Sequence, residues 1–425
     1  MNKVTYKNYK ETHIGAIPFE WEEVTMEEII ELVSGQSSPT HEVNYDGEGV
    51  PYVTGPEQWT GNYIEESKWV MNPRKVSPKD CFFITVKGSG TGKVFPGGQF
   101  AIGRDIMAIT SKLKSDTKFL FYVVTHQAER IVKNKVGMVP GISRSDILNH
   151  KIALPKLSEQ RKIATILTSI DEAIEKTEAI IKQTEKVKQG LMQRLLKKGI
   201  SHTKFKQTEI GEIPETWDVL NIGDIAKLQG GYAFKSSDYK LSGIQLIRIS
   251  NLFGKFLNLD KEPVYLPKSY LHEYDRFVLK PNDLIICMTG TLGKEDYGHV
   301  IKIPKINRPL LLNQRVGRFN IFGSVNTEFF YWYLSSRLFL DTIYKFGSGS
   351  KQANLSAKQI ESILIPIPPI DEQEKIGSVI NSVDNKTENE KQKLKQLKTL
   401  KNALMQVLLT GKVRVKVDDN AEVTV

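Results

Sequence analysis

Residues 9–21 of the chain read YKETHIGAIPFEW, and residues 205–217 read FKQTEIGEIPETW. The pattern Thr-x-Ile-Gly-x-Ile-Pro-x-x-Trp therefore occurs twice, with Gly15 of the first copy returning as Gly211 of the second, 196 residues later. A pattern that returns at a constant offset over such a distance indicates an internal repeat. The sequence thus predicts two copies of one structural unit in this chain of 425 residues.

A second pair of segments closes each copy. Residues 152–160 read IALPKLSEQ and residues 365–373 read IPIPPIDEQ, so that Pro155 returns as Pro368, 213 residues later. Because the two offsets, 196 and 213, differ by 17, the second copy carries 17 more residues between the shared ends.

A long helix is predicted after each Glu-Gln pair, because apolar residues there alternate spacings of four and three, as in a coiled coil. Gly199 and Gly411 can end the helices, which gives each about 35 residues and roughly 50 Å. One such stripe also fits an ordinary amphipathic surface helix, but two stripes in register favour helices that pack on each other. The expected interface residues are Ile163, Leu167, Ile170, Ile174, Ile181, Leu191, Leu195, Ile376, Ile380, Val383, Leu394, Leu397, Leu404 and Leu408.

Polar residues interrupt both stripes at matching places. Thr177 corresponds to Glu390, and Lys188 corresponds to Lys401, each 213 residues apart. Polar residues at such positions weaken a helix seam but help to fix its register.

Length and composition bound the rest of the interpretation. A chain of 425 residues fits two domains with connecting elements, and a formal charge of +10 favours a polyanionic partner such as nucleic acid. The polar N-terminus and the absence of a long apolar run predict a soluble, cytoplasmic protein. Two cysteines, Cys81 and Cys287, lie in apolar strand-like runs, which suits buried reduced thiols rather than a disulfide.

The organisation predicted from these features has five parts. They are a mixed α/β domain at 1–155, a long helix at 156–198, a second mixed domain at 199–367, a second long helix at 368–412 and a loose charged tail at 413–425. Within the domains, residues 50–54 and 245–250 are predicted as strands, and residues 118–124 and 328–334 as buried aromatic helices.

Motifs for catalysis on DNA are missing from the sequence. No Asp or Asn precedes a Pro-Pro-aromatic motif of the kind that holds a flipped base, and no cluster of carboxylates with a lysine indicates a metal-dependent nuclease. The seven histidines lack metal-ligand spacing. We therefore expect neither a catalytic residue nor a metal site in this chain.

The glycine-rich segment 88–93 (GSGTGK) imitates a phosphate-binding loop but departs from its pattern. Only three residues separate Gly88 from Gly92, and Val94 follows Lys93 where a hydroxyl residue is required. A similar segment, GTLGK at 290–294, follows the matching strand of the second copy. Two interpretations stay open: a plain hairpin turn, or a loop that approaches the DNA backbone with a lysine at its tip.

The repeated motifs resemble those of specificity subunits of type I restriction–modification systems. They are the paired Gly-x-Ile-Pro-x-x-Trp segments, the Pro-x-x-x-Glu-Gln-x-x-Ile helix starts, and the helix ends GLMQRLL at 190–196 and ALMQVLL at 403–409. The resemblance spans nearly the whole chain. It implies an α+β fold with two pseudo-twofold-related α/β target recognition domains separated by two long antiparallel coiled-coil spacer helices.

The resemblance also implies a division of labour. The chain itself would be non-catalytic and without a cofactor, and it would direct adenine-N6 methylation and ATP-dependent DNA cleavage by two methyltransferase subunits and two restriction and translocation subunits. S-adenosylmethionine, ATP and Mg²⁺ would then belong to those partners. Double-stranded DNA is the expected target.

Simple geometry agrees with a bipartite target. Two similar domains related by a pseudo-twofold axis would meet duplex DNA in equivalent ways. Helices of roughly 50 Å would correspond to about 15 base pairs or somewhat fewer. Since the two copies differ between their shared ends, we expect an asymmetric site with an unread gap.

Residue chemistry alone selects the DNA-contacting candidates, because Arg, Lys, Asn and Gln make bidentate base or phosphate contacts. For any single one of them, a solvated surface charge is the commoner role. The loop 347–354, and the loop 136–141 of the first copy, are further candidates. The selected residues are Lys87, Lys93, Arg104, Arg144, Arg248, Asn251, Lys294, Gln314, Arg315 and Lys351.

Two other classes of function stay open at this point. A coiled-coil scaffold with paired protein-binding domains would bind DNA weakly and without sequence preference. A DNA-modifying enzyme with an unfamiliar active site would methylate or cleave DNA as the purified chain alone.

Overall fold

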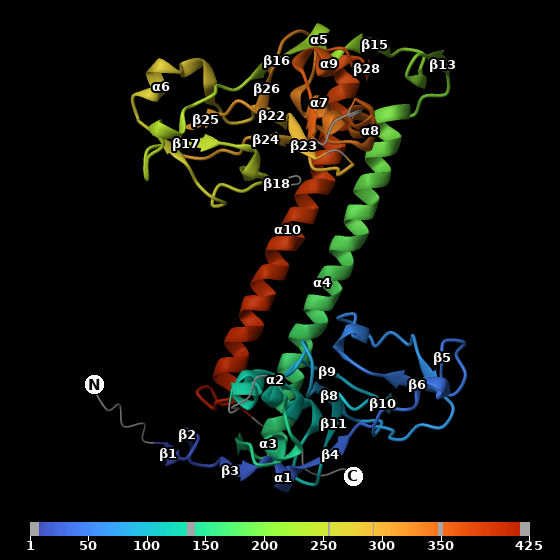
Figure 1. The fold of residues 1–425 in the computed structure, drawn as a ribbon, viewed down its shortest axis with the longest axis vertical. Helices are drawn as coiled ribbons and strands as arrows, with labels where there is room; N and C mark the ends of the chain where they lie inside the picture. Colours follow the sequence, from blue (N-terminus) through green and yellow to red (C-terminus); the bar gives the residue numbers. More distant parts are fainter. Residues whose placement is uncertain (1–7, 134–140, 254–255, 292, 347–351, 417–425) are drawn as a thin grey trace. The chain divides into compact units, whose positions relative to one another are not determined.

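The computed structural model describes residues 8–133, 141–253, 256–291, 293–346 and 352–416. Its contacts divide the chain into two compact units: unit 1 comprises Met1–Ala179 and Lys391–Val425, and unit 2 comprises Ile180–Glu390. Each unit holds one mixed α/β recognition domain and parts of two long helices, α4 (Leu157–Lys198) and α10 (Ile370–Leu408), as Figure 1 shows. Among the described residues, every helix is too short or too polar to cross a lipid bilayer.

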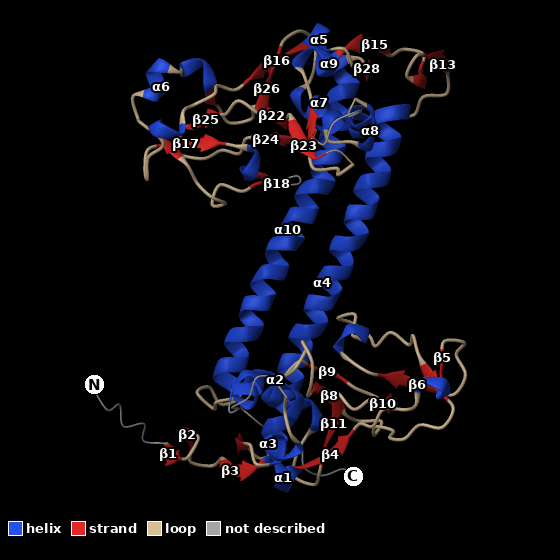
Figure 2. Cartoon of the chain, viewed as in Figure 1, coloured by secondary structure: helices blue, strands red, loops and turns tan. Residues whose placement is uncertain are grey.

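Each recognition domain contains two four-stranded sheets, whose strands are drawn red in Figure 2. The first sheet has the same arrangement in both units, whereas the second has its parallel strand pair at one edge in unit 1 and in the middle in unit 2. The first sheet of unit 1 has the order β4-β11-β8-β9 and that of unit 2 the order β16-β26-β22-β24. Their bounds are β4 (Ile30–Ser34), β11 (Ile106–Ser111), β8 (Phe82–Thr85), β9 (Val94–Pro96), β16 (Ala226–Gly230), β26 (Val316–Ile321), β22 (Leu284–Cys287) and β24 (Val300–Lys302).

The second sheet has the order β10-β6-β7-β5 in unit 1 and β20-β17-β25-β21 in unit 2. Two of its strands run parallel in each unit, β6 with β10 and β17 with β25. Their bounds are β10 (Ala101–Ile102), β6 (Val50–Val53), β7 (Trp69–Val70), β5 (Val43–Asn44), β20 (Tyr265–Leu266), β17 (Ile244–Ile247), β25 (Leu310–Leu312) and β21 (Val278–Leu279).

Short helices and strand pairs complete the domains. The predicted aromatic helices are present as α2 (Thr117–Lys133) and α7 (Thr327–Leu334), and the predicted strands as β6 and β17. The other elements are α1 (Met26–Ile29), α3 (Arg144–Leu148), α5 (Ile222–Ile225), α6 (Tyr270–Glu273), α8 (Arg337–Lys345), α9 (Ala357–Glu361), and the strand pairs β1 (Tyr9–Thr12) with β2 (Gly15–Pro18), β3 (Glu22–Thr25) with β12 (Lys151–Leu154), β13 (Phe205–Thr208) with β14 (Gly211–Pro214), β15 (Asp218–Asn221) with β28 (Leu364–Ile367), β18 (Leu252–Phe253) with β19 (Phe256–Leu257), and β23 (Thr289–Thr291) with β27 (Gln352–Asn354).

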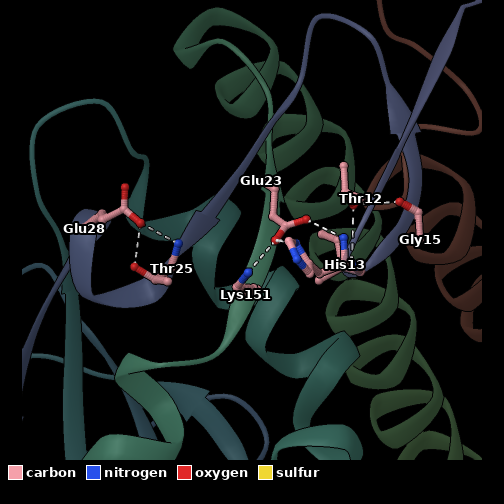
Figure 3. A network of polar contacts seen from close by, with 8 residues as sticks. Thr12, His13, Gly15, Glu23, Thr25, Glu28 and Lys151 are labelled. Carbon is pink, nitrogen blue, oxygen red and sulfur yellow. Dashed lines mark hydrogen bonds and ion pairs between the residues drawn. The ribbon is translucent and has the colours of Figure 1, made fainter.

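The repeated sequence at the start of each copy forms a hairpin. Gly15 and Gly211 have φ angles of 104° and 100°, which only glycine adopts readily. Thr12 Oγ1 donates to the Gly15 carbonyl at 2.7 Å, and Thr208 Oγ1 donates to the Gly211 carbonyl at 2.6 Å. In unit 1 this hairpin is further tied down by Glu23, which Figure 3 shows between Lys151 and His13.

The Glu-Gln pair at the start of α4 is buried, and its polar atoms are hydrogen-bonded. The Glu159 carboxylate accepts from Trp21 Nε1 at 3.0 Å and from Arg414 Nε at 2.7 Å. Gln160 donates to the Pro155 carbonyl at 2.8 Å and accepts from the Asp116 amide at 2.9 Å. The tryptophan at the end of the hairpin motif and the helix start thus recognise each other.

Unit 2 repeats this contact between the tryptophan and the helix start, with one different partner. The Glu372 carboxylate accepts from Trp217 Nε1 at 2.9 Å, while His202 Nε2 takes the place of the arginine at 2.8 Å. Gln373 donates to the Pro368 carbonyl and accepts from the Asn326 amide, both at 2.8 Å. The prediction of a loose tail from residue 413 is therefore wrong for its first residues, since Arg414 is bound at Glu159.

The ends of the long helices belong to the cores of the recognition domains. Ile163, Leu167 and Leu408 are buried in the core of unit 1. Leu195, Ile376 and Ile380 are buried in the core of unit 2. The remaining predicted interface residues are only partly buried, namely Ile170, Ile174, Ile181, Leu191, Val383, Leu394, Leu397 and Leu404. The apolar stripes therefore pack into the domain cores at their ends. The sequence had predicted one continuous helix–helix interface and no contact with the domain cores.

The predicted α+β class is confirmed.

Both cysteines are free and buried, in agreement with the sequence. Burial raises the pKa of the Cys81 thiol to about 11 and also raises the pKa of Cys287.

Candidate nucleic-acid interface

Four chain segments meet at one end of the first sheet of unit 1, where β8 ends and β11 begins. The Val86 amide donates to the Asp105 carbonyl, and the Ile142 amide donates to the Val86 carbonyl, both at 2.8 Å. The Gly35 amide donates to the Ile106 carbonyl at 3.0 Å. We call residues 35–36, 86–93, 103–105 and 141–142 the loop cluster of unit 1.

The same main-chain frame recurs in unit 2. The Met288 amide donates to the Arg315 carbonyl at 3.1 Å, and the Leu355 amide donates to the Met288 carbonyl at 2.8 Å. The Gly231 amide donates to the Val316 carbonyl at 3.0 Å. The loop cluster of unit 2 comprises residues 230–231, 288–291, 293–294, 313–315 and 353–355. Antiparallel strands bring these loops together because β16 and β22 end where β26 begins.

Six of the predicted residues lie on these clusters and are exposed. Unit 1 contributes Lys87, Lys93 and Arg104, and unit 2 contributes Lys294, Gln314 and Arg315. Lys93 Nζ lies 3.4 Å from the Pro56 carbonyl, and Arg104 lies 3.9 Å from the Asp105 carboxylate with 74% of its side chain exposed. Each cluster therefore presents long polar side chains that are not held tightly by their own domain.

The remaining predicted residues are placed less favourably. Arg248 directly follows β17, whose last residue, Ile247, accepts from the main-chain N–H of Asn313. The guanidinium of Arg248 donates to the Glu262 carbonyl at 2.7 Å. Arg144 donates to the Leu32 carbonyl at 2.6 Å and so serves partly to hold α3.

Asn251 was predicted to contact DNA, and that prediction is wrong. Its side chain is fully buried, its Oδ1 accepts from the Arg248 amide, and its Nδ2 donates to the Asn258 and Lys261 carbonyls. The amide is consumed in shaping a loop. Lys351, and the loop residues 347–351 and 136–140, lie outside the described residues.

Glycines in segment 88–93 are required by backbone conformation at Gly88 and Gly92 and by close packing at Gly90 and Gly92. Gly88 and Gly92 have φ angles of 85° and 87°. A Cβ at Gly90 would lie 2.5 Å from Pro56 Cγ, and one at Gly92 would lie 2.6 Å from Val132 Cγ2. These contacts favour the hairpin-turn interpretation for the glycines themselves, while the side chains of Lys87 and Lys93 are exposed and can face a ligand.

Sequence reasoning missed other polar residues of the clusters, notably Gln36 and Asn313. The main-chain N–H of Gln36 donates to the Ile102 carbonyl and so holds this residue beside the loop that carries Arg104. The side chain of Gln36 is exposed. No local signal marks either residue, because their position depends on strand pairings between distant segments. Throughout the described ranges, no group of three or more His, Cys, Asp or Glu side chains is arranged to hold a metal ion.

Comparison with known proteins assigns the chain to a family. The family model described as Type I restriction modification DNA specificity domain matches twice, at residues 18–186 and 214–399. The MjaVIII specificity subunit of Methanocaldococcus jannaschii is 31% identical over 420 residues, covering 96% of this chain and 97% of that protein. The putative MjaX specificity subunit of the same organism is 28% identical over 438 residues, with the same coverage of each chain.

A solved structure shares the fold. The S subunit of a type I restriction–modification system from M. genitalium aligns with a TM-score of 0.60 at 19% identity, covering 92% of this chain and 96% of that one. The duplicated domain and the full-length relatives together lead to one conclusion: the chain belongs to the type I restriction modification DNA specificity family and is a specificity subunit.

Proposed function

We propose that each recognition domain of this specificity subunit reads one half of an asymmetric, bipartite DNA site through its loop cluster. The observation that supports this proposal is the common main-chain frame of the two clusters combined with different exposed side chains. A shared frame would approach the two half-sites alike, and different side chains would select different bases.

The proposal extends to the partners. The long helices set the gap between the half-sites, and their exposed faces dock two methyltransferase subunits, to which two restriction and translocation subunits are added for cleavage. In this arrangement the chain is non-catalytic, and S-adenosylmethionine, ATP and Mg²⁺ are held by the partners. Because the target is cellular DNA, we also propose the cytoplasm as its location.

The test is to map methylated adenines in the genome of a host that expresses this chain with its cognate methyltransferase. We expect one bipartite motif that changes when this chain is exchanged for another specificity subunit. A contiguous motif, or a motif that does not follow the exchanged chain, would refute the proposal. Methylation or cleavage by the purified chain alone would support the alternative of an enzyme.

Individual residues are tested by alanine substitution on the loop clusters. Arg315→Ala should weaken discrimination at one half-site, by about 1–3 kcal/mol if the guanidinium makes a bidentate base contact. Lys93→Ala should affect the other half-site. Lys186→Ala removes an exposed lysine of α4 that belongs to neither cluster; it is the control and should leave both half-sites unchanged.

A further inference from the structure

In unit 1, three elements meet at one lysine. Lys401 on α10 places its Nζ 2.6 Å from the Asp171 carboxylate on α4 and 5.7 Å from the centre of the Tyr122 ring on α2. The Tyr122 hydroxyl in turn donates to Asp171 Oδ2 at 2.8 Å. The lysine, the acid and the aromatic residue therefore form a closed triangle between both long helices and the recognition domain.

Unit 2 builds the same arrangement with the helices exchanged. Lys188 on α4 places its Nζ 2.7 Å from the Asp384 carboxylate on α10 and 5.8 Å from the Trp332 ring on α7. Trp332 Nε1 donates to Asn381 Oδ1 on α10 at 2.8 Å. The two lysines, Lys188 and Lys401, are 213 residues apart, and so are the two acids, Asp171 and Asp384. Both ion pairs therefore stand at equivalent places of the repeat.

These lysines are the polar interruptions of the apolar stripes. Their side chains are only 23% and 24% exposed, and Tyr122 and Trp332 are 3% and 5% exposed. An apolar residue at either position would bury more surface without removing an ammonium group from water. What the charged pair offers instead is a directional interaction that holds partners in one geometry.

Fixing helix register alone would need only the lysine and the aspartate. Here the aromatic residue comes from the recognition domain, and in both units its polar atom donates to the helix that carries the acid. Unit 2 extends the contact through Glu328 on α7, which accepts from Lys302 at 2.8 Å and from Asn381 at 3.1 Å. The lysine, the acid and the aromatic residue therefore also fix the orientation of the recognition domain on the helix pair.

In unit 1, a pocket beside Lys401, Asp171 and Tyr122 leaves room for the recognition domain to take a different orientation. An open pocket of about 530 Å³ borders this contact and is lined by Tyr122, Asp171 and Lys401 together with Trp59 and Glu175. Solvent-accessible space next to a contact allows the domain to tilt when the contact is removed, because few protein atoms have to be displaced.

We propose that Lys401, Asp171 and Tyr122 in unit 1, and Lys188, Asp384 and Trp332 in unit 2, are positioning residues that fix the direction in which each recognition domain leaves the helix pair. In this role they determine how strictly the subunit selects one gap length. The inference rests on the proposed function, since it presupposes a bipartite site.

The experiment uses the full-length chain with its cognate methyltransferase and a set of duplexes that carry both half-sites with the preferred gap or with one base pair more or fewer. The readout is the ratio of methylation rates at the preferred and altered gaps. In Lys401→Ala and Lys188→Ala we expect this ratio to fall about tenfold, within the range of coupling between contacting residues. Lys401→Arg keeps the charge and should restore it.

Lys398→Ala is the matched control. Lys398 pairs with Glu178 at 2.7 Å and so also joins α10 to α4, but within the described part of the chain no ring contact to the recognition domain accompanies that pair. The control should leave the ratio unchanged, which separates seating of the domain from cohesion of the helices.

Tyr122→Phe keeps the buried ring and removes only the hydroxyl, so it should lower the ratio less than the lysine variants do. If the lysine variants fail to fold, Tyr122→Phe alone tests whether these residues control the selection of the gap length. An unchanged ratio in Tyr122→Phe and in every folded lysine variant overturns the inference while the bipartite motif stands. If the wild-type chain directs methylation to no bipartite site, the proposed function itself fails.

Discussion

Glu159 joins three parts of unit 1 through one carboxylate. Its side chain is 5% exposed and accepts from Trp21 and Arg414. Glu159→Ala would leave a buried indole N–H and a guanidinium without their acceptor, and because Arg414 is 39% exposed, water would recover part of the cost. We expect a loss of about 2–3 kcal/mol in the free energy of unfolding, measured by urea denaturation.

Glu175→Ala on the same helix is the control for this substitution. Glu175 is exposed, so its removal should change the free energy of unfolding by less than about 0.5 kcal/mol. Equal losses in the two variants would contradict a structural role for the Glu159 carboxylate.

Glu23 makes the stability of unit 1 depend on pH. Hydrogen bonds from Lys151, and also from His13, lower the pKa of Glu23 from 4.5 to about 2. A carboxyl with a depressed folded-state pKa stabilises the fold above its unfolded pKa and loses that contribution as the pH falls towards the folded value. Glu23→Gln should therefore be less stable than wild type at pH 7, and the difference should shrink below pH 4.5.

Urea midpoints at pH 7, 5, 4 and 3 measure this difference. Glu27→Gln, at an exposed neighbouring position, should track the wild-type chain throughout. A deficit in Glu23→Gln that stays constant over this range would show that the carboxylate charge is not what stabilises the hairpin.

Single residues mark the limit of what the sequence could predict. The Trp21 and Glu159 motifs were visible as repeated letters, yet nothing local to either segment indicates that they bond to each other. Asn251 has the chemistry of a base-reading residue, but burial against its own loop removes it from that role. Side-chain type states what a residue can do, whereas tertiary contacts decide which groups remain available.

Among the elements, α4 has two glycines with opposite roles, Gly190 within the helix and Gly199 directly after its last residue. Gly199 ends the helix at φ 64°, and a Cβ there would lie 2.5 Å from Glu372 Oε1 and 2.7 Å from Trp217 Cζ2. Gly190 lies within the helix, and a Cβ at that position would have nothing within 4 Å. Gly199→Ala should therefore destabilise unit 2 by about 2 kcal/mol, and Gly190→Ala should stabilise it by about 0.5–1 kcal/mol.

Thermal unfolding of the two single variants decides this prediction, since each serves as the control for the other. Midpoints that shift in the same direction would contradict the distinct roles assigned to the two glycines.

Helix periodicity predicted the two long elements and most of their apolar faces, because a spacing of four and three is a local property of the chain. It could not state what covers each face. Ile163 and Ile376 pack into domain cores, and Lys188 and Lys401 contact aromatic residues of the recognition domains. The loop clusters were indicated only by residue chemistry, since strand pairing across distant segments brings them together.

At the scale of the whole molecule, each loop cluster lies inside one compact unit, and α4 and α10 pass through the division between the units. One heptad inserted between Ala179 and Ile180, with another between Glu390 and Lys391, leaves both units intact. The insertion lengthens each helix by about 10 Å, or about 3 base pairs of DNA. We expect the mapped motif to gain that many unread base pairs with both half-sites unchanged.

A heptad is chosen because it keeps the a/d register of both helices. A four-residue insertion at the same places breaks that register and should abolish directed methylation rather than lengthen the gap. A motif whose gap is unchanged by the heptad would refute the helices as the determinant of spacing.

The burial of both cysteines has a practical consequence. The chain has only two thiols, Cys81 and Cys287, and both lie beneath the surface with raised pKa values, so a maleimide at neutral pH should react with neither until urea unfolds the protein. One cysteine engineered onto the surface of each recognition domain would then be the sole site of attachment there. Paired fluorophores at those positions would follow the movement of the two domains on DNA with both native thiols in place.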